Sequence, residues 1–149
     1  MSYSQMMKSG NQPFIGHILE LFSSKKSVET IVVDTQGIVG DKFYAKDIER
    51  SVLISSIDSY TMAKEKGINL EFGKLGENIL MEYNPYHMKS GTQIKIGEVV
   101  LEINQKCTLC KSLTKIDSKL PKLLKDDRGI FSKVIKGGTI RKNDKIYIV

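Results

Sequence analysis

Two cysteines, the only ones in the chain, stand three positions apart as Cys107-Thr-Leu-Cys110, directly after a strand-like run. In that run, residues 98–104, apolar and polar side chains alternate as they do in a half-buried strand. Lysines at positions 106 and 111 flank the pair, and nearby cations lower the pKa of a thiol and favour the thiolate. A thiolate attacks electrophiles and binds metals, so this segment is the candidate reaction centre.

Three kinds of site use cysteines at this spacing: a redox dithiol, half of a zinc site, and one reactive thiol beside a spectator. Zinc needs a second pair of ligands, and the two histidines, His17 and His87, are far apart in sequence. A thioredoxin-like motif would begin a helix inside a βαβ unit, which the β-rich surroundings disfavour. Burial as a small apolar side chain is the alternative for Cys107, and it suits Cys110 less well.

Length and composition indicate one soluble domain over residues 1–149, with residues 1–12 as a flexible N-terminal segment. Hydrophobic residues make up 40% and charged residues 27%. No apolar run approaches the ~20 residues that cross a bilayer. The N-terminus lacks the apolar core of a signal peptide. We therefore expect a cytoplasmic protein with reduced thiols and no membrane partner.

The net charge of +6 comes from 23 basic residues against 17 acidic ones. The basic residues are scattered, and the aromatic residues do not alternate with them as platforms for stacked bases would. We therefore expect no nucleic-acid partner. The charge fits a solvated, lysine-rich surface or a small anionic ligand, and composition alone does not choose between them.

Short β-like segments dominate the chain. Strands are predicted at residues 16–22, 28–33, 51–55, 78–83, 93–97, 98–104 and 145–149. Helices are predicted from Ser55 or Ser56 through Lys66, at residues 119–125, and at residues 129–135 before the glycines at 137 and 138. Most strands are too close in sequence for helical crossovers, which disfavours a parallel α/β sheet. The predicted fold class is mostly β with a few short helices, in a β-barrel.

Three further motifs each have two interpretations, one as a ligand-binding site and one as ordinary local structure. The glycines at 37 and 40, before Asp41 and Lys42, allow a β-turn or the close approach of backbone to a ligand. Asn78, at the end of a Leu-Gly-Glu-Asn run, offers a donor and an acceptor to a heterocycle or to nearby backbone. Arg128 can clamp a phosphate bidentately or be solvated at the start of a helix.

The order of these motifs closely resembles the MOSC domain, named for the C-terminal part of molybdenum-cofactor sulfurase. The ordered set runs from about Gly16 to the C-terminus: Gly-x-x-Gly-Asp-Lys at 37–42, Arg-Ser-Val-Leu-Ile at 50–54, Leu-Gly-Glu-Asn at 75–78, the strand with Leu-Glu at 101–102 that leads to Cys110, Gly-x-Phe at 129–131, and Gly-Gly at 137–138. The chain departs from the family where arginine and histidine are usual, because Lys42 and Phe43 stand there. Lys42 keeps the charge but not the fork geometry of arginine.

The resemblance implies a MOSC-type barrel that binds the molybdenum cofactor, a pterin with a dithiolene and a phosphate. The family's functional cysteine, thought to carry sulfur or to ligate the metal, matches Cys110, and Cys107 matches a position that varies. Asn78 matches an asparagine presented to the pterin. Four basic residues match positions that can meet the phosphate: Lys42, Arg50, Arg128 and Lys133.

The activity that the resemblance implies is reduction of N-hydroxylated compounds at a molybdenum ligated by Cys110. Electrons would come from a separate donor, because no flavin, haem or iron–sulfur motif is visible. A first alternative is a sulfur carrier that takes a persulfide on Cys110 from a cysteine desulfurase, with Cys107 as resolving thiol. A second is a non-catalytic module that stores or delivers the cofactor. Pyridoxal phosphate is not expected to bind this chain, and the sequence leaves open whether the protein is an enzyme and which small molecule is its substrate.

Overall fold

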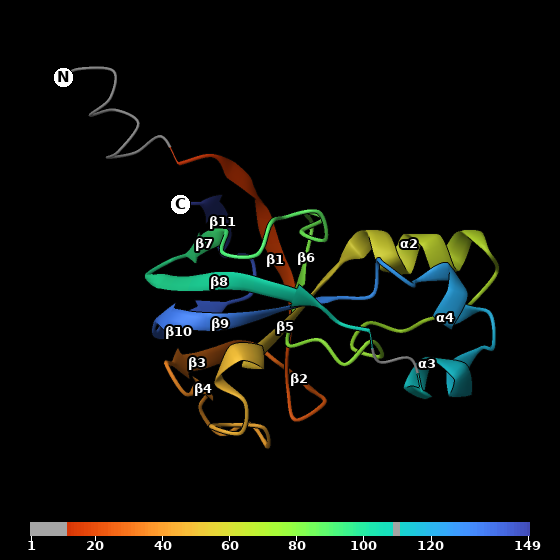
Figure 1. Cartoon of the computed structure of the whole chain (residues 1–149), viewed down its shortest axis with the longest axis horizontal. Helices are drawn as coiled ribbons and strands as arrows, with labels where there is room; N and C mark the ends of the chain where they lie inside the picture. The colour runs from red at the N-terminus through yellow and green to blue at the C-terminus, as the bar shows by residue number, and fades with distance from the viewer. Residues whose placement is uncertain (1–11, 109–110) are drawn as a thin grey trace.

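Seven strands close into a β-barrel in the part of the chain that the computed structural model describes, residues 12–108 and 111–149 (Figure 1). The barrel closes because β11 pairs antiparallel with both β1 and β7. Around the barrel the order is β1 (Phe14–Ser23), β6 (Ile79–Met81), β5 (Val52–Ser56), β9 (Ile130–Lys136), β8 (Val99–Lys106), β7 (Gln93–Ile96) and β11 (Lys145–Ile148). Closure removes the unpaired edges that an open sheet would expose. The predicted β-barrel fold is confirmed.

A three-stranded sheet of β10 (Gly138–Arg141), β3 (Thr30–Asp34) and β4 (Gly37–Ile38) accompanies the barrel. Its buried side chains alternate: Ile31 and Val33 are buried, whereas Val32 between them is half exposed. These buried residues belong to the same apolar cluster as the barrel interior, so the two sheets share one core. The strand predicted over residues 28–33 is divided, because β2 (Lys26–Val28) pairs with β1 and β3 pairs with β10.

The pairing of β5 with β6 is parallel, and α2 (Ile57–Glu65) lies in the connection between them. Ser56 caps this helix, since its hydroxyl oxygen accepts a hydrogen bond from the backbone N of Asp58 at 3.1 Å. Gly67 follows the last turn with a positive φ of 74°. The helix predicted from Ser55 or Ser56 through Lys66 is confirmed.

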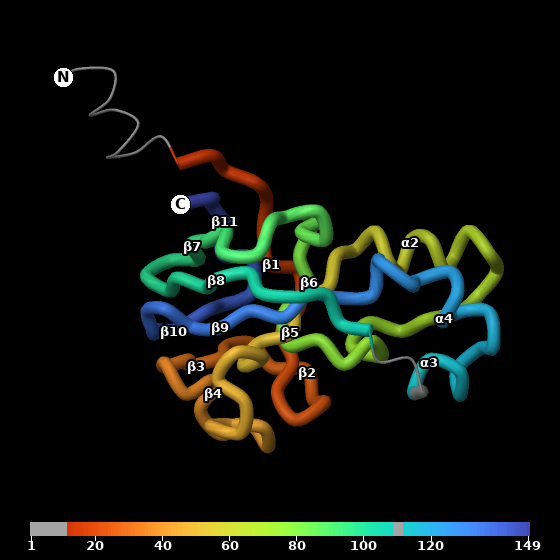
Figure 2. Tube along the Cα trace, in the orientation of Figure 1, coloured from red at the N-terminus to blue at the C-terminus, as the bar shows by residue number. Residues whose placement is uncertain are grey.

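Three helices gather beside one end of the barrel: α2, α3 (Lys111–Ile116) and α4 (Leu120–Leu123) (Figure 2). They enclose a second apolar cluster, separate from the barrel interior. Its buried members are Tyr60, Ala63, Ile68, Leu75, Leu80, Leu113, Leu120 and Leu124. Cys107 and Thr108, which follow β8, and the segment that joins α4 to β9 therefore lie where the barrel meets the helices.

The helix predicted over residues 129–135 is wrong, because β9 occupies this segment. Ile130, Ser132 and Val134 are buried and Phe131 and Lys133 are half-buried, which is the period of two that a strand produces. β9 pairs antiparallel with β5 on one side and β8 on the other. Pairing with two strands, both distant in sequence, decides the conformation here, and local periodicity does not reveal it.

The prediction that Gly137 and Gly138 end a helix is wrong, because Gly137 joins β9 to β10 and Gly138 is the first residue of β10. A Cβ on Gly137 would lie 2.5 Å from the carbonyl oxygen of Val33, so only glycine lets the connection pass this close to β3. The helix predicted at residues 119–125 appears in shorter form as α4, and α3 was not predicted. The predicted flexible segment over residues 1–12 lies outside the described residues except for its last position.

Candidate functional site

Arg128 lies on the segment between α4 and β9, and its side chain is buried with 7% of the residue exposed. Its Nη2 donates to the carbonyl oxygen of Leu75 at 3.3 Å and to the Ser112 hydroxyl at 3.2 Å. Its Nε and Nη1 are shielded from solvent and have no partner within the described residues. No carboxylate of those residues forms an ion pair with this guanidinium. A buried cation without a counter-charge is costly, and an anion relieves that cost.

Cys107 lies beside the Arg128 segment, because its backbone N donates to the carbonyl oxygen of Gly129 at 2.9 Å. The residue is only 3% exposed, and its thiol is free. It therefore resembles a buried apolar side chain more than an accessible nucleophile. Cys110 lies outside the described residues, so its predicted roles stay predictions. The described His, Cys, Asp and Glu residues contain no group of three that could hold a metal ion.

The side-chain amide of Asn78 hydrogen-bonds to the backbone of two barrel strands. Its Oδ1 accepts from the backbone N of Leu53 at 2.9 Å, and its Nδ2 donates to the carbonyl oxygen of Phe22 at 3.3 Å. The backbone of Asn78 also bonds both residues, at 2.8 Å each. The amide thus connects β1 and β5 immediately before β6 begins. Its predicted contact with a pterin is a further role that the geometry does not test.

Arg50 belongs to η1 (Ile48–Arg50), a short 3-10 helix packed against β9. Its Nε lies 3.7 Å from Asp47 Oδ2, and its guanidinium lies over the Phe131 ring at 5.5 Å from the centroid. With the Gln105 amide oriented to satisfy its neighbours, the amide oxygen accepts from Arg50 Nε at 3.0 Å and from Nη2 at 2.9 Å. Arg50 therefore has protein partners on several sides.

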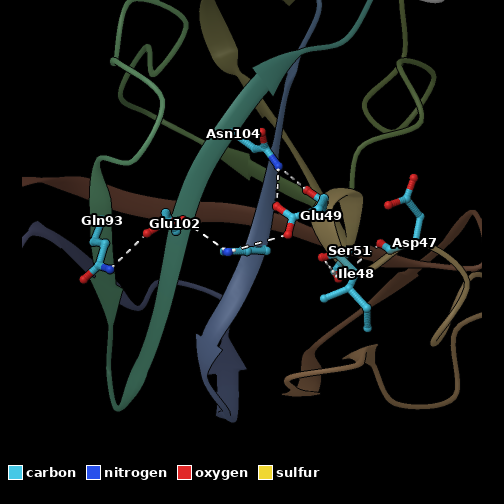
Figure 3. A network of polar contacts seen from close by, with 8 residues as sticks. Asp47, Ile48, Glu49, Ser51, Gln93, Glu102 and Asn104 are labelled. Atoms are coloured by element: carbon cyan, nitrogen blue, oxygen red, sulfur yellow. Dashed lines mark hydrogen bonds and ion pairs between the residues drawn. The ribbon is translucent and has the colours of Figure 1, made fainter.

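Lys133 bridges two carboxylates on the outside of the barrel. Its Nζ lies 3.6 Å from Glu49 Oε1 and 3.5 Å from Glu102 Oε2. Asn104 Nδ2 donates to the backbone oxygen of Glu49 at 2.8 Å and to its Oε2 at 3.0 Å, which completes the network (Figure 3). These contacts fasten η1 to β8 and β9. The charge of Lys133, unlike that of Arg128, is matched by carboxylates.

Lys42 lies in the exposed turn that follows β4. Its backbone N donates to the Ser24 hydroxyl at 3.0 Å, and its Nζ lies 5.0 Å from the centroid of the Phe43 ring. The structure thus brings Arg128 and Cys107 together, while Lys42, Arg50 and Lys133 take part in other contacts. Their predicted meeting with a phosphate remains a prediction.

Glu77 and Tyr60 form a buried acidic pair that sequence reasoning did not single out. Glu77 is 2% exposed, accepts a hydrogen bond from the Tyr60 hydroxyl, and has no partner for its Oε1 in the described chain. Burial raises the pKa of Glu77, and the hydrogen bond from Tyr60 opposes that rise. Burial, reinforced by Glu77, also raises the pKa of Tyr60. The only sequence signal was the position of Glu77 between the glycine at 76 and Asn78.

A surface hollow of about 570 Å³ beside α2 is lined by none of the predicted site residues that the structure describes. Its lining includes Tyr60, Lys64, Asn69 and Phe72. The Tyr60 and Phe72 rings meet edge to face, with centroids 5.0 Å apart.

Similarity to known proteins identifies the family. A model of the MOSC domain matches residues 24–147, which is most of the chain. The chain belongs to the MOSC domain family. The family predicted from the order of the sequence motifs is therefore confirmed. No curated protein matches this MOSC protein significantly.

No helix in the described part of the chain is long and apolar enough to span a membrane.

Solved structures share the MOSC barrel seen here. The YuaD protein from Bacillus subtilis has a TM-score of 0.76 at 18% identity, over 91% of this chain and 94% of that chain. YiiM from Escherichia coli has a TM-score of 0.70 at 18% identity, over 92% of this chain and 70% of its own. YiiM from Geobacillus stearothermophilus has a TM-score of 0.66 at 14% identity, over 92% and 75%. At these identities the similarity establishes the fold.

Proposed function

We propose that this MOSC protein binds the molybdenum cofactor, with Arg128 contacting its phosphate and Cys110 supplying a thiolate to the metal. The observation that carries the proposal is the buried Arg128 guanidinium, whose Nε and Nη1 find no acceptor within residues 12–108 and 111–149. A phosphate supplies the missing negative charge and several acceptor oxygens. Both nitrogens are closed to solvent, so binding involves a local rearrangement of the groups that cover them.

The thiolate ligand is proposed from the position of Cys110 in the sequence. Residues before and after this cysteine in the sequence contact the Arg128 segment. The backbone N of Cys107 donates to the carbonyl oxygen of Gly129, and the Ser112 hydroxyl accepts from Arg128 Nη2. A soft thiolate suits a metal that already carries sulfur ligands. Cys107 is buried, which supports assigning the metal to Cys110.

The cofactor, when bound, would supply two-electron reduction of N-hydroxylated compounds. The residues of this chain would bind and orient it: Arg128 would hold the phosphate, and Asn78 would keep β1 and β5 together. A separate protein donates the electrons, and a reducing compartment such as the cytoplasm keeps the thiols free. If the cofactor passes through without turnover, the same contacts serve storage or delivery.

The test is metal and pterin analysis of the protein purified from a host that makes the cofactor. Wild type is compared with Cys110→Ala, Arg128→Gln and the control Arg141→Gln, which removes the same charge from the exposed end of β10. We expect near-stoichiometric molybdenum and pterin in wild type and in Arg141→Gln. Cys110→Ala should lose metal, and Arg128→Gln should lose both metal and pterin.

The two ligand assignments fail separately in this experiment. Molybdenum retained by Arg128→Gln would refute the phosphate contact and leave the thiolate assignment intact. A protein that carries no molybdenum, but gains the mass of one sulfur atom on Cys110 after exposure to a cysteine desulfurase, would refute metal ligation. The sulfur-carrier function would then replace it.

A further inference from the structure

The segment that carries Arg128 has three consecutive backbone carbonyls bound from outside it. The carbonyl oxygen of Asp127 accepts from the Ser59 hydroxyl, and that of Arg128 accepts from the Ser55 hydroxyl at 2.8 Å. The carbonyl oxygen of Gly129 accepts from the backbone N of Cys107. Ser55 and Ser59 are completely buried. Arg128 itself lies at a bend outside any helix or strand. Its segment has no backbone hydrogen bonds of a helix or sheet, so these three bonds satisfy its carbonyl groups.

Ser59 is the last member of a directional chain of hydrogen bonds. The backbone N of Ser56 donates to the Tyr86 hydroxyl oxygen at 2.8 Å, and the Tyr86 and Ser59 hydroxyls lie 2.6 Å apart. Each hydroxyl has one proton, so with Ser59 donating to Asp127, Tyr86 must donate to Ser59. Burial raises the pKa of Tyr86 to about 12, so this phenol keeps its proton at neutral pH. β5 and α2 thereby fix the position of residue 127.

Gly129 brings the same segment against β5. A Cβ at this position would lie 3.0 Å from Leu53 Cδ1 and 3.3 Å from the carbonyl oxygen of Ile54. The backbone on the C-terminal side of Arg128 is thus held by packing, and on the N-terminal side by Ser59. At the far end of the side chain, Leu75 and Ser112 hold Nη2, while Nε and Nη1 have no partner among the residues that the structure describes.

We propose that Ser55 and Ser59 are positioning residues that preset the Arg128 guanidinium for a phosphate-type anion. This inference rests on the proposed function, in which Arg128 contacts the cofactor's phosphate. Ordering a long side chain before binding removes an entropy cost from the binding step, so the anion binds more tightly. Neither serine needs to touch the anion for this effect.

Ser132 provides a matched control for Ser55. It is also completely buried, and its hydroxyl donates to a backbone carbonyl, that of Val52, at 3.1 Å. Ser132→Ala and Ser55→Ala therefore each remove one buried serine–carbonyl bond between β5 and the β9 side of the barrel. Their losses of thermal stability should be similar, and only Ser55→Ala releases the Arg128 peptide.

The experiment is titration of the full chain with inorganic phosphate, followed by NMR chemical shifts well below the unfolding temperature. We expect Arg128→Gln to abolish the saturable shifts and Ser55→Ala to raise Kd about three- to tenfold, the range for ordering one long side chain. Ser132→Ala should leave Kd within about twofold. Tyr86→Phe, which keeps the ring and loses the proton donated to Ser59, should also raise Kd.

Two results would overturn the inference and can be told apart. If Ser55→Ala and Ser132→Ala bind phosphate equally well while Arg128→Gln does not bind, the serines are merely structural and the phosphate contact of Arg128 stands. If wild type shows no phosphate binding that depends on Arg128, both the positioning role and the proposed phosphate contact are wrong. Tyr86→Phe gives a second test should Ser55→Ala fail to fold.

Discussion

Replacing Glu77 by glutamine should change how stability depends on pH. Glu77 is 2% exposed and accepts one hydrogen bond from Tyr60, and its Oε1 has no partner in the described part of the chain. Its pKa in the folded protein is raised by burial from an ordinary value of 4.5. Above that value the unfolded chain releases the proton while the folded chain still binds it. The folded state therefore binds more protons, and stability is lost as pH rises towards the folded pKa.

The size of the effect follows from proton linkage. Each pH unit between the unfolded and folded pKa values removes about 1.4 kcal/mol from the free energy of unfolding of wild type. Residue 77 has no titrating proton in Glu77→Gln. The free energy of unfolding of this variant, relative to that of wild type, should therefore rise by that amount per pH unit between the two pKa values and stay constant above the folded one. For a domain of this length, 1 kcal/mol corresponds to roughly 2–4 °C in Tm.

Urea unfolding of both proteins at a series of pH values, from about pH 4 to about pH 8, measures this difference. Glu65→Gln, at the exposed end of α2, is the control and should run parallel to wild type. Tyr60→Phe removes the hydrogen bond that lowers the pKa of Glu77, so this pKa should be higher in the variant. The fall in its free energy of unfolding with pH should therefore continue to a higher pH than in wild type. A constant difference between Glu77→Gln and wild type over the whole range would refute the assignment of Glu77 as a buried acid.

Three further changes test the fold. Gly137→Ala places a Cβ 2.5 Å from a carbonyl oxygen of β3 and should cost about 1–3 kcal/mol in urea unfolding, as overpacking does. Asn78→Ala leaves the backbone N of Leu53 without its acceptor and should cost about 1–3 kcal/mol, measured in the same way. His17→Ala removes the 2.8 Å contact that lowers the pKa of Glu82, so NMR titration should show the pKa of that carboxyl rising; an unchanged value would show that the contact is absent in solution.

Much of the fold was predictable because its signals are local. The helix after β5 has a serine cap, and the hairpin of β7 and β8 alternates around the glycine at position 97. The glycine-spaced motifs, taken in order, identified the MOSC family without any structure. β9 was not predictable in this way, because Phe131 and Lys133 sit on its half-buried face and suggest no strand until β5 and β8 pair on both sides.

The sequence by itself determined which residues are candidates for chemistry: a cysteine pair after a strand, an asparagine before another, and four cations. Only the tertiary structure decided which of these cations is buried without a carboxylate partner among the described residues. Lys133 and Arg50 meet carboxylates, whereas Arg128 meets a carbonyl and a hydroxyl and is held through Ser55, 73 residues away in sequence. The reason is physical: the charge state of a residue type follows from its chemistry, but burial and pairing depend on groups that only folding brings within reach.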